Sequence, residues 1–209
     1  GAPVARFAVF LDWLWDGGLL SASERATLAG RMVEVVYTHC YLRLKGRLPA
    51  GDNQQSSMAF ACAVTGYIFG HKRGHAPAAR EMFRAGVSRY YGLLRRLGAG
   101  GWSGEGSTYH CQVVAPVLAL FTAFMEQITG RDLLNLRLGE SSVGETLTTA
   151  CSIVNGAGLL PGWDDYGNCA PQLKTHFVYL ARRTREAWPL EEIVRHGMWS
   201  ENEILAWYN

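Results

Sequence analysis

Residues 113–125 read VVAPVLALFTAFM and form the longest apolar run in the chain. A helix that crosses a membrane needs about 20 apolar residues, so this run predicts a buried helix of a globular protein. Its apolar residues recur at spacings of three and four, as they do along one face of an α-helix. The same spacing predicts helices in residues 4–15, 26–44, 59–69, 82–97, 113–128, 147–154, 173–180 and 204–208.

Short polar motifs mark the ends of these helices. Ser21 with Glu24, and Ser142 with Glu145, have the capping-box spacing, in which a hydroxyl and a carboxylate satisfy free amide groups at a helix start. Helix stops are predicted at Gly46, Gly70, Gly98, Gly130 and Gly156. Helices of about 15 to 22 residues joined by short loops build antiparallel helix hairpins, so we expect an all-α single domain over residues 1–209, either a toroid or an irregular bundle.

The composition excludes several classes of protein. Hydrophobic residues make up 48% of the 209 residues and charged residues 18%, which excludes intrinsic disorder. Lys and Arg total 20 against 18 acidic residues, so the net charge of +2 gives no broad field for nucleic acid or an anionic membrane. The cysteines are widely spaced and contain no CxxC, so we expect buried thiols rather than disulfides or metal ligands. They are Cys40, Cys62, Cys111, Cys151 and Cys169. No metal and no cofactor are expected elsewhere in the chain.

A glycine-rich connection at residues 98–109, GAGGWSGEGSTY, carries more polar and aromatic side chains than a plain linker needs. Its glycines give the backbone the freedom to bring Trp102, Glu105 and Tyr109, with the adjacent His110, to one place. Tryptophan offers a stacking face for a sugar ring, and the carboxylate can orient a phenol. The alternative is an ordinary turn in which Tyr109 packs as an amphipathic side chain.

A second polar stretch, GDNQQSS at residues 51–57, precedes an apolar helix. Asp52 or Asn53 in this position is typical of an N-cap. The same helix start, with the side-chain amides of Asn53 and Gln54, is also suited to holding a substrate carboxylate and partly neutralising it. Both interpretations stay open from the residues alone.

A third stretch at residues 156–168, GAGLLPGWDDYGN, offers Trp163, Asp164 and Asp165. Paired carboxylates in a loop can bind a cation, serve as acid and base, or cap the following helix. Trp163 is a second candidate for stacking on a sugar ring.

Taken in order, these motifs resemble the heparinase II/III-like polysaccharide lyases, which include the alginate and oligoalginate lyases. The resemblance covers residues 40–209 and rests on GDNQQSSMAFACAVTGYIFG, GGWSGEGSTYHCQVVAPVLALF, GLLPGWDDYGN and the terminal ILAWYN. It implies an incomplete (α/α) toroid whose cleft is lined by the three polar stretches. The family's β-sandwich and early toroid helices are absent from this chain, so we expect a fragment whose partners are those parts of its parent, in a periplasmic or secreted protein.

The resemblance also implies roles for individual residues. Asn53 takes the place of the asparagine that neutralises the substrate carboxylate, and Tyr109 that of the catalytic tyrosine. Gln54 stands where many relatives have a histidine, and an amide donates a hydrogen bond but exchanges no proton near neutral pH.

The chemistry of a uronic-acid lyase agrees with these roles. Such an enzyme removes the proton at C5 and expels the group at C4, and amide donors stabilise the charge that develops on the carboxylate. Tyr109 suits the proton transfers. With an ordinary pKa of about 10 it readily protonates a leaving oxygen, and it acts as the base only where nearby positive charge or donors favour the phenolate. His110 is a possible helper, although on a helix its side chain diverges from that of Tyr109 by about 100°.

We therefore expect a lyase that acts on an acidic polysaccharide, and the sequence leaves open whether this fragment is active alone. Gln54, Trp102, Glu105, Trp163 and Asp164 are the expected substrate-binding residues. One alternative is a glycoside hydrolase that uses Glu105 with Asp164 or Asp165 as its acid and base. The other is a helical module that binds glycans without catalysis.

Overall fold

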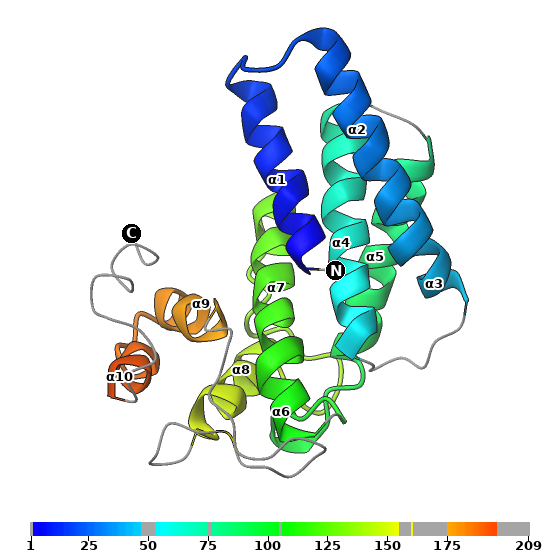
Figure 1. Cartoon of the computed structure of the whole chain (residues 1–209). Coiled ribbons are helices and arrows are strands. Elements are labelled where there is room, and N and C mark those ends of the chain that lie inside the picture. The colour runs from blue at the N-terminus through cyan, green and yellow to red at the C-terminus, as the bar shows by residue number, and fades with distance from the viewer. Residues whose placement is uncertain are drawn as a thin grey trace. The chain divides into compact units, whose positions relative to one another are not determined.

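The computed structural model describes residues 2–46, 53–74, 77–104, 106–154, 160 and 175–195 (Figure 1). These residues are mostly helical and contain no strand, so the prediction of an all-α chain is confirmed for the described part. The chain divides into two compact units, Gly1–Gly92 and Leu93–Asn209. We call them the first and second units. The toroid and the single domain stay predictions.

Helices of the first unit fall where the apolar spacing predicts them, and those at residues 22–36 and 53–67 begin a turn or more earlier because their first turns are polar. Two π-helical segments, η1 and η2, continue the helices that precede them. The elements are α1 (Ala2–Asp16), α2 (Ala22–Val36), η1 (Tyr37–Tyr41), α3 (Leu42–Lys45), α4 (Asn53–Tyr67), η2 (Ile68–Lys72) and α5 (Pro77–Leu94). Gly70 is therefore not a helix stop, as the sequence predicted, but lies inside η2.

Both predicted capping boxes are present. The amide of Glu24 donates to Oγ of Ser21, and the amide of Ser21 donates to Oε2 of Glu24 at 2.8 Å, so α2 begins where the motif indicates. Ser142 and Glu145 make the same reciprocal pair at the start of α8 (Val143–Ser152). Each pair satisfies two amide donors that a helix start would otherwise leave without a partner.

Helix α4 is the centre of the first unit, because it packs on α1, on α2 and on α5. Its contact with α5 is so close that neither helix has room for a side chain at two glycines. A Cβ atom at Gly66 would lie 2.5 Å from the carbonyl oxygen of Ala79, and one at Gly86 would lie 2.5 Å from that of Ala59. The order of these contacts makes α4 and α5 antiparallel.

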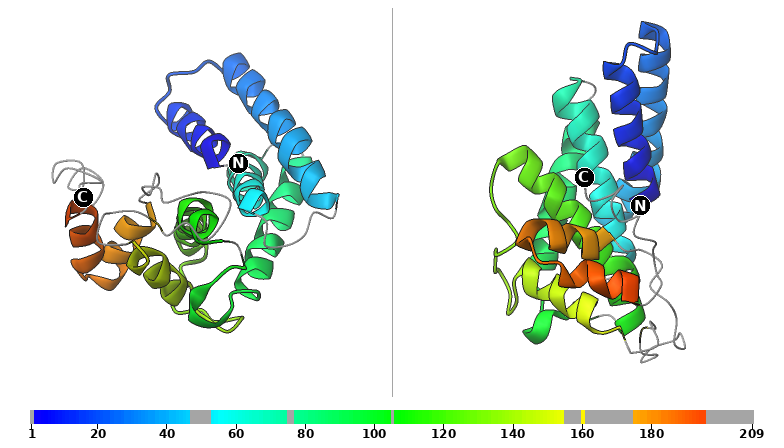
Figure 2. Two further views of the ribbon diagram at one scale, coloured as in Figure 1. Left: turned by 60° about the horizontal axis from the view of Figure 1, so that its bottom comes forward. Right: turned by 90° about the vertical axis from the view of Figure 1, so that its left-hand side faces the viewer.

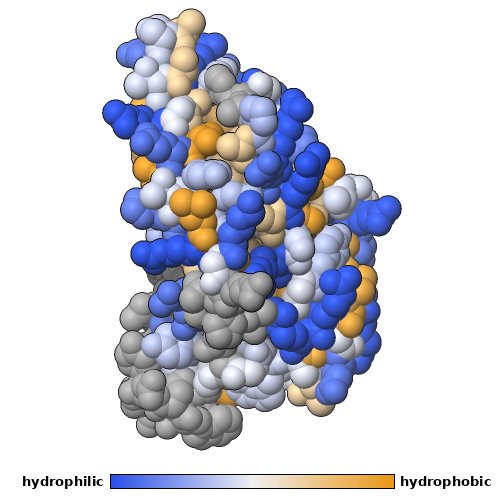
Figure 3. All heavy atoms as spheres, turned by 90° about the vertical axis from the view of Figure 1, so that its right-hand side faces the viewer, coloured by the Kyte–Doolittle hydropathy of each residue, from blue (hydrophilic) through white to orange (hydrophobic). Residues whose placement is uncertain are grey.

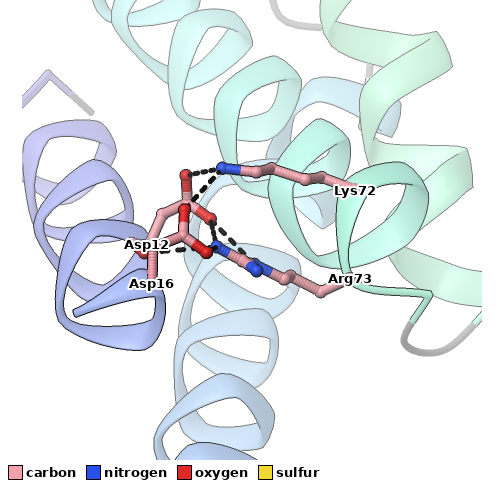
Figure 4. Close-up of polar contacts among 4 residues, drawn as sticks. All are labelled: Asp12, Asp16, Lys72 and Arg73. Atoms are coloured by element: carbon pink, nitrogen blue, oxygen red, sulfur yellow. Dashed lines mark hydrogen bonds and ion pairs between the residues drawn. The ribbon is translucent and has the colours of Figure 1, made fainter. Parts of the chain in front are cut away.

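The first unit also contains an ion network that joins α1 to the end of η2 (Figure 4). Nη2 of Arg73 lies 2.6 Å from carboxylate oxygens of both Asp12 and Asp16, and Nζ of Lys72 lies 2.7 Å from Asp12. The hydrogen bonds from Arg73 and then Lys72 lower the pKa of the Asp16 carboxyl. The mostly buried Asp12 therefore has both basic residues as partners.

In the second unit, α8 and α9 pack on α7, and α10 packs on α9 (Figure 2). The remaining bounds are η3 (Ala99–Gly101), α6 (Ser107–Tyr109), η4 (His110–Val114), α7 (Ala115–Thr129), α9 (Thr175–Thr184) and α10 (Trp188–Arg195). Gly130 ends α7 in the left-handed conformation at φ 67°, as predicted. Helix α10 was not predicted from the apolar spacing.

Four of the cysteines, Cys40, Cys62, Cys111 and Cys151, are buried free thiols, as the sequence predicted, and Cys169 lies outside the described residues. On the face drawn in Figure 3, hydrophilic and hydrophobic side chains are interspersed, and neither kind forms one continuous patch. By length and hydropathy alone, the helical stretch His110–Thr129 is long and apolar enough to cross a membrane, and 56% of its most apolar window is buried inside the structure.

Close packing at Gly86 and open space at Gly30 predict opposite effects of glycine-to-alanine substitution on stability. Gly86→Ala should lower the free energy of unfolding by about 1–3 kcal/mol, because the new methyl group meets backbone atoms of α4. Gly30→Ala, on the open face of α2 with no atom near its Cβ position, should raise it by about 0.5–1 kcal/mol. Urea unfolding curves measure both changes, and equal values for the two variants would contradict the close packing.

Candidate functional site

The glycine-rich segment before α6 is held in one conformation rather than free. The amide of Gly98 donates to the carbonyl oxygen of Trp102 at 2.8 Å, which closes the turn. Oγ of the buried Ser141 accepts from the amide of Gly101 at 2.9 Å and donates to the carbonyl oxygen of Gly98 at 2.7 Å. The turn is therefore fixed to the residues that begin α8.

Gly101 is required by both its backbone conformation and its neighbours. Its φ is +85°, which L side chains rarely adopt, and an added Cβ would lie 2.7 Å from Cα of Thr146 in α8. From the sequence, this glycine was expected to give the backbone freedom. In the structure it permits a backbone contact that positions the next residue, Trp102.

Trp102 belongs to this fixed turn, and its side chain packs against the buried His110. It is half-buried, and its ring centroid is 4.7 Å from that of His110 at an interplanar angle of 56°. The part of the indole that stays accessible is available for stacking on a ligand ring. His110 thus supports one side of the indole.

His110 is completely buried at the start of η4. Its Nδ1 atom lies 3.0 Å from Oγ of Ser103, which is itself buried. Burial lowers the pKa of His110 to about 4. The imidazole is therefore neutral at pH 7.

A second buried histidine, His176 in α9, was not singled out from the sequence. Burial lowers its pKa to about 3, and the neighbouring His110 also lowers it. Within the described residues, neither ring nitrogen of His176 has a hydrogen-bond partner. The available signal was its position inside the apolar repeat of residues 173–180, where a polar ring is unusual.

Tyr109 is the last residue of α6 and is half-buried. Its backbone dihedrals of −67° and −37° are helical, so the loop does not persist through it into η4. Tyr109 and His110 are therefore successive helical residues whose side chains point in different directions, one partly accessible and one buried.

Asn53 and Gln54 begin α4 in the first unit. Asn53 is half-buried and its carbonyl oxygen accepts a hydrogen bond from Oγ of Ser56 at 2.8 Å, whereas Gln54 is exposed. Since Asn53 and Tyr109 belong to different compact units, their meeting at one sugar stays a prediction.

Other predicted residues lie outside the described part of the chain, namely Asp52, Glu105, Trp163, Asp164 and Asp165. In the part that is described, no three His, Cys, Asp or Glu side chains are grouped so that they could hold a metal ion. His71, which has a metal-like spacing to His75 in the sequence, is exposed with its ring 4.9 Å from that of Phe83, and His75 lies outside the described residues.

Comparisons of the chain with protein-family models, with curated proteins and with solved structures find no match. The likeness to the heparinase II/III-like lyases therefore rests on the motifs and their order. The geometry of each unit is independent of that likeness.

The buried histidines predict a loss of stability in acid. Both have pKa values below the ordinary 6.5, so the unfolded chain binds more protons below pH 6.5 than the folded chain does. The contribution of both neutral histidines to the free energy of unfolding should be complete above pH 6.5. It should fall by about 1.4 kcal/mol per pH unit for each histidine as the pH decreases towards 4.

The variant His176→Phe should remove about half of this pH dependence, whereas His39→Gln, at an exposed position, should leave it unchanged. Urea unfolding at pH values between 7.5 and 4 measures the slopes. Identical slopes for wild type and His176→Phe would show that His176 does not titrate on unfolding.

Proposed function

We propose that this protein is a polysaccharide lyase that cleaves a uronic-acid-containing acidic polysaccharide by β-elimination. The observation that carries the proposal is the fixed turn at residues 98–103. It holds Trp102 against a buried histidine and leads into the helix that carries Tyr109. Such rigid positioning of an aromatic face beside a partly accessible phenol suits sugar binding followed by proton transfer.

In the proposed reaction, Tyr109 acts as a phenolate, a form that nearby donors or positive charge favour, and it removes the proton from C5 of the uronic acid to become a phenol. The electron pair of the C5–H bond forms the C4–C5 double bond, and the C4–O bond breaks. The phenol then returns its proton to the leaving oxygen, so the tyrosine is regenerated and no co-reactant is consumed. One product carries an unsaturated sugar at its new end.

Asn53 and Gln54 neutralise the substrate carboxylate in this proposal. An ionised carboxylate barely stabilises a carbanion at C5, and hydrogen-bond donors aimed at it lower the barrier by several kcal/mol. The position of both residues in the first turn of α4 supports this role, because the dipole of a 15-residue helix favours negative charge at that end. Asn53 and Tyr109 facing the same sugar is part of the proposal.

His110 was predicted as a helper in proton transfer, and its burial favours a different role. A neutral ring with no solvent exposure is suited to holding Trp102 in place. Trp102 and Trp163 then stack on sugar rings, Glu105 orients Tyr109, and Asp164 contacts the substrate.

The wider setting is also proposed. The two units are parts of an incomplete (α/α) toroid, completed in the parent protein by further toroid helices and a β-sandwich. The parent acts in the periplasm or after secretion, where acidic polysaccharides are met.

A panel of polymers tests the proposed activity. The full-length protein should release products with the ultraviolet absorbance of a 4,5-unsaturated uronate from heparan sulfate, hyaluronan or alginate. Tyr109→Phe should lower kcat by at least about 10²–10⁴-fold with little change in substrate affinity, because it removes only the proton transfer. Tyr37→Phe, at another half-buried tyrosine, is the matched control.

Reducing ends without that absorbance would indicate a glycoside hydrolase, and binding without products would indicate a non-catalytic glycan module. Full kcat in Tyr109→Phe would rule out the proton-transfer role even if the protein is a lyase.

Asn53→Ala distinguishes carboxylate neutralisation from helix capping. In the proposed role kcat falls by about 10²–10³-fold, as when one donor to a developing charge is removed. If Asn53 serves only as a cap, kcat stays unchanged and the free energy of unfolding falls by about 1 kcal/mol. Steady-state kinetics and urea unfolding of the same sample separate the two outcomes.

A further inference from the structure

The second unit contains a polar cavity of about 580 Å³ at the end of α7, beside α9. This volume is in the range that small-molecule sites occupy. Its charged residues are Glu126, Arg131, Asp132, Arg182 and Arg183, and the half-buried ring of Tyr179 also lines it. Three arginines and two carboxylates give the cavity a net charge of +1.

One of the three arginines is already neutralised within the cavity. Nη2 of Arg183 lies 3.1 Å from Oε1 of Glu126 and 2.9 Å from Oδ1 of Asp132. Glu126 is further fixed by the hydroxyl of Tyr179, which donates to its Oε2 at 2.9 Å. Burial and the Glu126 charge raise the pKa of Tyr179, so this phenol remains a donor. Arg183 therefore belongs to the wall of the cavity.

The positive charges of the other two arginines are not neutralised by an acidic side chain within the described residues. Arg131 and Arg182 are exposed, and within the described residues neither guanidinium has an ion pair or a hydrogen bond. The dipole at the end of α9 by itself favours basic residues such as Arg182 and Arg183 in its last turn. The end of α7 favours a basic residue at Arg131 in the same way, so the case for a ligand rests on the two arginines lining one cavity from two different elements.

We propose that this α7–α9 cavity binds an oxyanion group, a carboxylate or sulfate, carried on a sugar. Arg131 and Arg182 supply paired guanidinium donors, which match the planar geometry of a carboxylate and also suit a sulfate. Gln127 and the ring of Tyr179 line the remaining wall, where a sugar can find both an amide partner and an apolar surface. The choice of a sugar as the carrier rests on the proposed function, and the site itself is separate from Tyr109.

Titration of the full-length protein with glucuronate, followed through the arginine side-chain N–H resonances in NMR spectra, tests the proposal. The resonances of Arg131 and Arg182 should shift and saturate with glucuronate and should not respond to glucose. Arg131→Gln and Arg182→Gln should each weaken binding by about tenfold, the usual effect of losing one charged hydrogen-bonded contact.

Two matched variants sharpen the result. Asp132→Asn should tighten binding several-fold, because it removes one of the two carboxylates of the cavity and leaves Arg183 paired with Glu126 alone, while its amide oxygen still accepts from the amide of Leu134. Arg95→Gln, at an exposed arginine outside the cavity, should change nothing.

Affinities in Arg131→Gln and Arg182→Gln equal to that of Arg95→Gln would overturn the site. Sulfate ion binding as tightly as glucuronate would overturn the assignment to a sugar. Saturable glucuronate binding without any unsaturated product from polymers would refute the lyase and leave the cavity site standing. Unsaturated product with no response at Arg131 and Arg182 would refute only the cavity site.

Discussion

The close contact between the backbone of Gly101 and Thr146 is the constraint on which the candidate site depends. A positive φ and the absence of a side chain let the turn at residues 98–103 lie directly on α8. Ser141 then bonds to both ends of that turn, and Trp102 leaves it against the ring of His110. A methyl group at this one position would displace the whole arrangement. A similar close packing at glycine occurs in the first unit, where Gly66 and Gly86 allow α4 and α5 to approach each other.

Burial divides the residues of the site by role. His110 and His176 lie in the interior as neutral rings, whereas Trp102 and Tyr109 remain partly accessible. A group that transfers protons has to reach the substrate, so the half-buried phenol suits the chemistry better than the histidine beside it. The buried imidazoles support the site at a cost in stability at acid pH.

Much of the helical pattern could be predicted from local sequence. Apolar spacing located α1, α2, α4, α5, α7, α8 and α9 but not α6, and the serine–glutamate motifs at Ser21 and Ser142 marked two helix starts, because both signals act between residues a few positions apart. The prediction of a helix stop at Gly70 was wrong. At this position the absence of a side chain allows close packing on the backbone of Arg80. Helix α10 has only eight residues, so the helical spacing repeats little more than twice along it. Interactions between distant residues, such as Asp12 with Arg73 or Gly101 with Thr146, leave no periodic signal in one sequence.

The central claim is that the phenol of Tyr109 and the amide of Asn53 face the same uronic acid. A crystal structure of the full-length Tyr109→Phe variant with an acidic tetrasaccharide tests it most directly. The account predicts one sugar whose carboxylate accepts a hydrogen bond from Asn53 and whose C5 lies beside residue 109, with Trp102 against a neighbouring ring. A tetrasaccharide bound away from either residue, or the two residues on separate faces of the protein, would contradict it.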